Sequence, residues 1–267
     1  MKNKNNTIRT PHRYYNVYIF VVVPVWGSYL HKVNKAISSV YPAKVTLVTD
    51  QKNKNSSSIK KLEQQVHQII FVENPTIGKA REIGRKNTFG KLVLFMDADD
   101  ELKENALLAL LTMLNQNPHC VASCGTMGRK TRGGTWPTPQ NLKLGCSPIG
   151  KYVLLFKNVL PTIGVCLMVK DRLPDVLFPE LEDEDWHAAI RLRRKGKICF
   201  TPEPLMTYYD TPGSVSRSPR KLNNLEHSHN QLSQPNPNFF TRMVDMVAKK
   251  YRYNKNVTLV KQWEPPN

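Results

Sequence analysis

Short apolar runs alternate with polar, helix-patterned segments through the first half of the chain. Runs of this length, rich in Val, Ile and Phe, are typical of strands buried on both faces of a parallel sheet. We expect strands at 18–23, 44–49, 68–72, 91–96 and 120–124. We expect helices at 29–40, 59–66, 77–87 and 102–115. This alternation predicts a doubly wound, mostly parallel α/β sheet with helices on both faces and right-handed crossovers.

The regular pattern stops after residue 125. Gly and Pro are frequent from 126 to 150, which predicts a long loop, and a strand is expected at 162–170. A helix is then expected to run from the acidic segment 180–185 to Lys195, with Gly196 as its stop signal. The chain is thus divided into a basic arm (1–15), one domain (16–218, with halves meeting near residue 125) and a C-terminal extension (219–267).

Three carboxylates follow the apolar run 91–96 directly. Asp97, Asp99 and Asp100 lie within four residues, where a parallel strand ends and where such sheets bind ligands. Clustered carboxylates repel one another unless a cation neutralises them, and Mg²⁺ and Mn²⁺ favour oxygen ligands. The alternative is a turn in which Asp99 or Asp100 caps the next helix, although a cap needs only one acid.

A second acidic cluster opens the helix expected before Lys195. Five of the six residues from 180 to 185 are acidic, and basic residues fill the last turns of the same helix. Acids first and bases last match the helix dipole, so capping explains part of the pattern. A carboxylate held close to an electron-poor carbon can also act as a general base. The sequence alone leaves both roles open.

The charge of the chain indicates an anionic partner. The formal net charge is +18 over 267 residues, which suits nucleic acid, a phosphate polymer or an acidic membrane, and is also compatible with a solvated basic surface. The five cysteines, with no signal-peptide pattern, predict free thiols in a reducing, cytoplasmic compartment. The apolar segment 17–25 contains Pro24 and is too short to span a bilayer, so we expect no transmembrane segment.

Four motifs in order resemble those of the family 2 glycosyltransferases, which have the GT-A fold. They are Val23-Pro24-Val25-Trp26, Gly78-Lys79-Ala80-Arg81, Asp97-Ala98-Asp99 and Glu184-Asp185-Trp186. The second is two residues shorter than the usual spacing. The resemblance extends over about residues 17–218 and implies a nucleotide-sugar half (16–125) and an acceptor half (126–218).

The resemblance also implies roles for individual residues. Pro24, Trp26 and Asp50 would border the nucleotide base. Lys79 and Arg81 would approach the diphosphate. Asp97 would touch the ribose or sugar, and Asp99 would bind Mn²⁺ or Mg²⁺. Asp185 would be the catalytic base of an inverting transfer. Trp136, Glu184 and Trp186 would lie on the acceptor side.

Two departures from the family pattern limit which family roles can be assigned to residues of this chain. The segment 208–216 lacks the Arg and His that family members often carry there, which leaves Asp210 as a substitute oxygen ligand for the metal. The Gln-x-x-Arg-Trp motif and the membrane helices of processive synthases are also missing. Transfer of one sugar is therefore favoured over polymerisation.

The expected function is transfer of a sugar from a nucleotide-diphosphate sugar, with UDP favoured by the resemblance. Basic residues that would flank the acceptor favour an anionic cell-envelope glycan, reached in the cytoplasm or by peripheral contact with the inner face of the membrane. These residues are Lys2, Lys4, Arg9, Arg13, the basic residues of 129–132 and 191–197, Arg217, Arg220 and Lys221. The alternatives are a transferase for hydroxylated bases in DNA, a sugar nucleotidyltransferase, and a non-catalytic polyanion or nucleic-acid binder.

Overall fold

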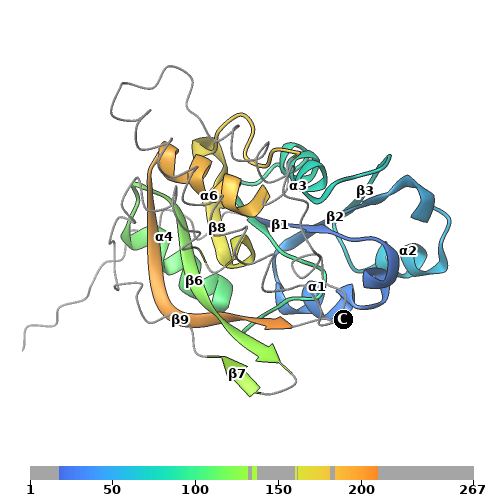
Figure 1. Ribbon diagram of the computed structural model, residues 1–267, viewed down its shortest axis with the longest axis horizontal. Helices are drawn as coiled ribbons and strands as arrows, with labels where there is room; N and C mark the ends of the chain where they lie inside the picture. Colours follow the sequence, from blue (N-terminus) through green and yellow to red (C-terminus); the bar gives the residue numbers. More distant parts are fainter. Residues whose placement is uncertain (1–17, 132–133, 137–159, 161, 181–183, 210–267) are drawn as a thin grey trace, which may run out of the picture.

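The computed structural model describes residues 18–131, 134–136, 160, 162–180 and 184–209. Within this part, helices lie on both faces of one curved sheet (Figure 1). The expected basic arm and C-terminal extension lie outside the described residues, as does most of the loop expected at 126–150. The described part of that range belongs to strands and not to a loop, so the expectation is wrong there. Among the residues that are described, no helix is both long and apolar enough to cross a bilayer.

The nine described strands form a single sheet in the order β3-β2-β1-β4-β8-β6-β9-β5, with β7 paired to β6. Their bounds are β1 Ile19–Pro24, β2 Lys44–Asp50, β3 Gln68–Val72, β4 Leu92–Phe95, β5 Glu101–Leu102, β6 Cys120–Thr131, β7 Gly134–Trp136, β8 Cys166–Val169 and β9 Lys197–Tyr209. Strands β3, β2, β1 and β4 are parallel, as the alternating pattern predicts.

The second half of the sheet is mixed. Strand β8 is antiparallel to both β4 and β6, whereas β6 is parallel to β9. The expectation of parallel pairing through the fifth strand is therefore wrong at this point. No local pattern reveals that β8, which is far along the chain, inserts between β4 and β6.

The helices also depart from the expected bounds in places. The described helices are α1 Val33–Ser39, α2 Ser57–Leu62, α3 Ile77–Lys86, α4 Ala106–Gln116 and α6 Glu184–Lys195, with 3-10 turns at Gly27–His31, Gln51–Asn53, Ile163–Val165 and Lys170–Arg172. The helix expected at 29–40 is thus a 3-10 turn followed by α1. The helix expected from residue 102 begins at Ala106, because Leu102 pairs with β9 instead.

Alternating side chains of the central strand separate two apolar layers. Val21 and Val23 of β1 pack into a cluster with α1, α2 and α4, whereas Val22 points into the opposite cluster with α3 and α6. Helix α3 lies close to the sheet at Gly84, where an added Cβ would lie 2.3 Å from Val22 Cγ1. The absence of a side chain at Gly84 therefore lets α3 pack directly against the sheet.

The cysteines differ from expectation. Cys124 on β6 lies opposite Cys166 on β8 and forms a disulfide with it, and a second disulfide joins Cys120 to Cys199 on β9. The expectation of free thiols is wrong for these four, because strand pairing brings together residues that are distant in sequence. Cys146 lies outside the described residues.

Candidate active site

The carboxyl ends of β1, β2 and β4 meet at one edge of the sheet. Residues of this edge are linked by backbone hydrogen bonds from Val25 N to Val48 O (2.9 Å) and from Met96 N to Val22 O (3.0 Å). The side chains of Trp26 and Asp50 are both half-buried there, and Asp50 accepts a hydrogen bond from Lys52 N at 2.9 Å. The structure thus brings Pro24, Trp26 and Asp50 to the same edge of the sheet as the three acids that follow β4.

The three acids after β4 are not equivalent. They form a turn closed by a hydrogen bond from Asp100 N to Asp97 O at 3.2 Å. Asp97 and Asp99 are half-buried, whereas Asp100 is 1% exposed. Within the described part of the chain, no well-formed hydrogen bond reaches either carboxyl oxygen of Asp100, although the Tyr209 backbone lies near them. Burial raises the pKa of Asp100 well above its usual value, and Asp97 and Asp99 add to this, against opposing effects of Arg81 and the Tyr209 backbone.

The acidic cluster therefore contains two half-buried carboxylates that are candidate metal ligands, and one carboxyl group in the protein interior. Asp97 and Asp99 remain accessible at the edge, while Asp100 belongs to the protein interior. A tyrosine that sequence reasoning missed lies close by. Burial raises the pKa of Tyr29, and Asp99, Tyr208 and Asp97 raise it further. No sequence pattern marks Tyr29, because the 3-10 turn that carries it overlaps the start of the helix expected at 29–40.

Arg81 of α3 connects the acidic turn after β4 to the start of α6. Arg81 is 2% exposed, and its guanidinium places Nη2 2.5 Å from Asp97 Oδ1 and Nη1 2.7 Å from Glu184 Oε1. The guanidinium also stacks on Phe178, with 5.4 Å between its central carbon and the ring centroid. Burial alone would lower the pKa of Arg81, but Asp97, Glu184 and Asp185 together raise it.

Glu184 and Asp185 open α6 beside this guanidinium. Burial raises the pKa of Glu184 to about 7. The nearby Asp185 carboxylate also raises this pKa, and the two effects outweigh the opposing effect of the Arg81 charge. Asp185 is half-buried, and its Oδ1 accepts a hydrogen bond from Trp186 N at 2.7 Å. Trp186 packs against the apolar cluster on this face. The two motifs that contain Asp97 and Asp185, far apart in sequence, are thus neighbours in space.

The structure gives less detail on the three other predicted residues of the site and its metal. Lys79 is half-buried in the first turn of α3, where the Thr76 hydroxyl caps its backbone N–H. Trp136 pairs with Arg129 in the β6–β7 hairpin, but its side chain is not among those described. Asp210 lies outside the described residues.

The carboxylates at this edge suit a divalent cation whose remaining ligands are phosphate oxygens of a substrate. The described residues contain no group of three or more His, Cys, Asp or Glu that would hold a metal by themselves. Mg²⁺ and Mn²⁺ are commonly held by one or two carboxylates together with substrate phosphates. Asp99 at the edge, with Asp97 33% exposed beside it, offers such a partial shell.

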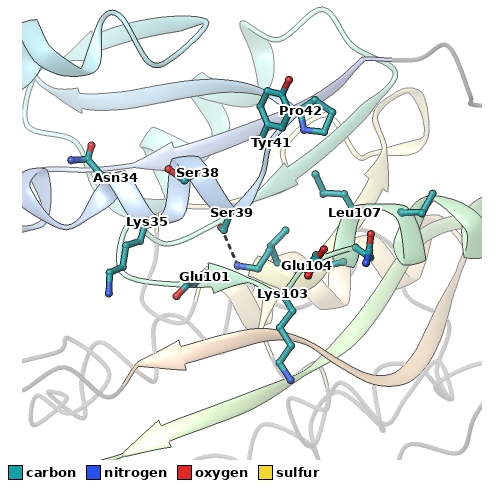
Figure 2. A pocket seen from close by; sticks show the side chains of 14 residues that line it. Asn34, Lys35, Ser38, Ser39, Tyr41, Pro42, Glu101, Lys103, Glu104 and Leu107 are labelled. Carbon is teal, nitrogen blue, oxygen red and sulfur yellow. Dashed lines mark hydrogen bonds between the residues drawn. The ribbon is translucent and has the colours of Figure 1, made fainter.

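A cavity of about 710 Å³ lies away from these carboxylates, along α1 and the start of α4 (Figure 2). Its lining includes Lys35, Ser39 and Glu101, and the Ser39 hydroxyl accepts a hydrogen bond from Leu102 N at 3.1 Å. None of the predicted site residues lines it. Its nearest link to the site is Glu101, which accepts a hydrogen bond from the Tyr209 hydroxyl at 2.8 Å.

A GT-A sheet with an acidic turn after β4 and a second acidic motif opening α6 defines a nucleotide-sugar glycosyltransferase. The glycosyl transferase family 2 model matches residues 21–176, more than half of the chain, and the protein belongs to this family. It is therefore a glycosyltransferase. A comparison of the sequence with curated proteins gives no match.

Solved structures share the fold at low sequence identity. S. aureus TarS 1-349 in complex with UDP-GlcNAc is 15% identical, with a TM-score of 0.65 over 89% of this chain and 73% of that one. The mannosyltransferase PcManGT from Pyrobaculum calidifontis, in complex with GDP-Man and Mn²⁺, is 13% identical, with a TM-score of 0.59 over 95% of this chain and 77% of that one.

Proposed function

We propose that this glycosyltransferase is metal-dependent and moves one sugar, with inversion, from a UDP-sugar to a hydroxyl group of an anionic glycan. The observation that carries the proposal is Arg81, whose two ends bind Asp97 and Glu184. This guanidinium holds the donor-side acids and the start of α6 at one place, where donor and acceptor must meet.

The donor side is built on strand ends. In this proposal, Pro24, Trp26 and Asp50 border the base, and Asp97 contacts the ribose or sugar. Asp99 holds the divalent cation, which supplies neutralisation of the diphosphate charge when it is bound. Lys79 adds a positive charge at the first turn of α3. TarS bound to UDP-GlcNAc and PcManGT bound to GDP-Man and Mn²⁺ support this class of donor.

The acceptor side is built on the start of α6. The acceptor hydroxyl oxygen attacks the anomeric carbon, its proton passes to the Asp185 carboxylate, and the bond from the anomeric carbon to the diphosphate oxygen breaks. General-base assistance of this kind is worth about 10²–10⁴ in rate. Glu184 and Trp186 flank the base, with Glu184 held by Arg81.

Charge supports an anionic acceptor. The net charge of +18 exceeds what a nucleotide diphosphate needs, and basic residues occupy the last turn of α6. A phosphate-bearing glycan of the cell envelope would be held by such cations, and we place the enzyme in the cytoplasm or at the inner face of the membrane.

A donor screen tests the proposal. Thermal unfolding should be followed with UDP-sugars and GDP-Man, each with Mn²⁺, with Mg²⁺ and with chelator, because a bound donor raises the melting temperature by mass action. We expect a rise with a UDP-sugar only when the cation is present, and no rise for Asp99→Asn. An equal rise with chelator would remove the metal from the proposal, and no rise with any nucleotide sugar would refute it.

A further inference from the structure

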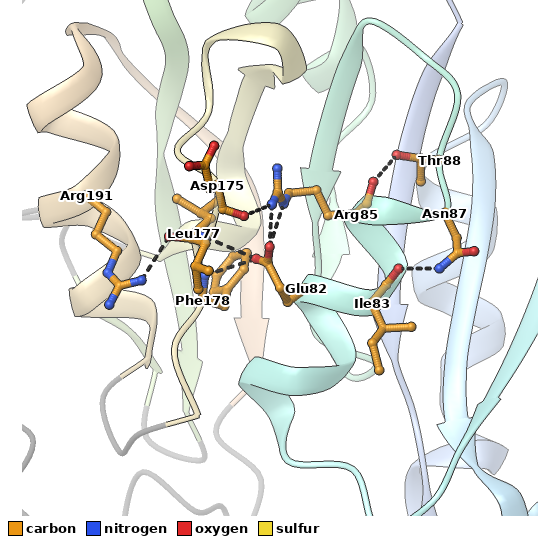
Figure 3. A network of polar contacts seen from close by, with 10 residues as sticks. Glu82, Ile83, Arg85, Asn87, Thr88, Asp175, Leu177, Phe178 and Arg191 are labelled. Carbon is orange, nitrogen blue, oxygen red and sulfur yellow. Dashed lines mark hydrogen bonds and ion pairs between the residues drawn. The ribbon is translucent and has the colours of Figure 1, made fainter.

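Glu82 of α3 is a buried carboxylate that the chemistry above does not use. It is 7% exposed, and its two oxygens have different partners (Figure 3). Oε1 accepts hydrogen bonds from the Arg85 guanidinium, from Nε at 3.2 Å and from Nη2. Oε2 accepts from the backbone N–H groups of Leu177 at 3.1 Å and Phe178 at 3.2 Å. A buried carboxylate is costly without such donors, so the burial of Glu82 depends on the positions of Leu177 and Phe178.

The segment 175–178 is irregular, and side chains from two helices satisfy its backbone. Arg85 Nη2 donates to Asp175 O at 2.6 Å, and Arg191 of α6 donates from Nη1 to Val176 O at 2.9 Å. Together with the two bonds to Glu82, four consecutive residues of the segment are each held by a side chain of α3 or α6. Leu177 and Phe178 are buried, and buried backbone groups outside regular structure need such partners. The segment therefore acts as a spacer that is bonded to both helices.

This spacer reaches the active site through two described contacts. The Phe178 ring lies under the Arg81 guanidinium, which binds Glu184. The next residue, Pro179, lies against Gly78, where an added Cβ would be 2.3 Å from Pro179 O and 3.5 Å from Glu184 Cβ. A shift of the segment would therefore move the start of α6 relative to α3.

We propose that Glu82 is a positioning residue, which fixes segment 175–180 and through it the first turn of α6 with Asp185. The inference rests on the proposed role of Asp185 as the base. A displacement of about 1 Å at a catalytic group can reduce the rate by about 10²-fold. The donor side is carried mainly on the ends of β1, β2 and β4 and is linked to this segment through Arg81, so donor affinity should change less than turnover.

The test is Glu82→Gln in the full chain, which keeps the shape of the side chain but removes its charge. The assay is release of nucleoside diphosphate from the donor that the thermal screen identifies, with water as acceptor. We expect kcat to fall roughly 10- to 100-fold while KM for the donor changes less than about threefold. Lys86→Gln, at an exposed position of the same helix, is the matched control and should retain both constants.

A double variant separates positioning from a general loss of stability. If Glu82 acts through Asp185, adding Glu82→Gln to Asp185→Asn should cost little further rate, since coupled residues are non-additive. Multiplied losses, or a fall in donor affinity as large as the fall in kcat, would overturn the proposal. Should Glu82→Gln fail to fold, Arg85→Lys keeps a positive charge beside Glu82, and should lower kcat alone, to a smaller extent.

Amide hydrogen exchange gives a readout that is independent of activity. In Glu82→Gln, exchange should accelerate in 175–180 and 184–188 but not in β1 or β2. If the wild type releases no nucleoside diphosphate, the proposed function fails, and the exchange pattern still decides whether Glu82 holds the segment. Unchanged exchange in both ranges would overturn the proposal whatever the activity.

Discussion

Nη2 of Arg81 lies 2.5 Å from Oδ1 of Asp97, although the two residues are sixteen positions apart, with strand β4 between them. The other end of the same guanidinium binds Glu184, 103 residues further along the chain. A planar fork can satisfy two carboxylates in this way, whereas an ammonium group cannot hold both in fixed directions. Arg81 therefore sets the distance between the donor-side acids and α6.

Replacing Arg81 by lysine should be costly although the charge is kept. We expect Arg81→Lys to lower the free energy of unfolding by less than the roughly 3–5 kcal/mol that removing one partner of a buried ion pair costs, because the positive charge is kept. Both donor affinity and turnover should fall, because both carboxylates lose their fixed partner. Urea unfolding and calorimetry with donor measure these effects. Wild-type stability in this variant would show that the two contacts are not structural.

Glu184 should make stability depend on pH. Burial raises its pKa from 4.5 to about 7, so its contribution to stability is fully present below the unfolded value and is lost as the pH rises through about 7. A shift of this size corresponds to on the order of 3 kcal/mol. Between pH 4.5 and 8, the wild type should lose up to about this much stability relative to Glu184→Gln. A difference that stays constant across that range in urea unfolding would contradict the prediction.

A side chain at Gly78 should reduce activity because there is no space for it. In a helix, alanine is normally preferred over glycine by about 1 kcal/mol. At Gly78, however, a Cβ would lie 2.3 Å from the backbone oxygen of Pro179, which cannot move without shifting the segment that leads to α6. We expect Gly78→Ala to lower kcat at least tenfold, measured as nucleoside diphosphate release. Lys86→Ala is the control, and equal activity of the two variants would show that the segment yields freely.

The acceptor proposal predicts strong salt dependence. Each phosphate that is neutralised releases counterions, so affinity for a phosphate-rich glycan should fall steeply as salt rises. Replacing Arg129, Lys130 and Arg132 by alanine should weaken binding and reduce the slope. Replacing Lys60 and Lys61, exposed on α2, should not. Titrations with the glycan and with duplex DNA distinguish the two polymers, and salt-independent binding would refute an anionic acceptor.

The sequence predicted the parallel half of the sheet well. Continuous apolar runs marked β1, β2, β3 and β4 within one or two residues. Strands β1, β2 and β4 are buried on both faces and need no alternation, whereas β3 lies at the edge of the sheet and is mostly half-buried. It did not predict β5, the length of β6 or the insertion of β8. These features depend on pairing between distant segments, such as Leu102 with Met206, which leave no periodic signal.

The site was predicted in part, for similar reasons. The pattern and the family resemblance identified Asp97, Asp99 and Asp185, but it did not show that Asp100 turns into the interior. Nor did it show that both terminal nitrogens of the Arg81 guanidinium bind carboxylates. Burial and contact between distant segments decide both points. The roles of the acids in donor binding and catalysis remain predictions.

The most direct test of the central claim is the activity of Asp185→Asn at saturating donor. Asparagine is close in shape to aspartate but cannot accept the acceptor proton. Calorimetry should give donor affinity within about threefold of wild type, while release of nucleoside diphosphate falls about 10²–10⁴-fold. Turnover near the wild-type rate in this variant would contradict the account and leave Asp185 as a cap of α6.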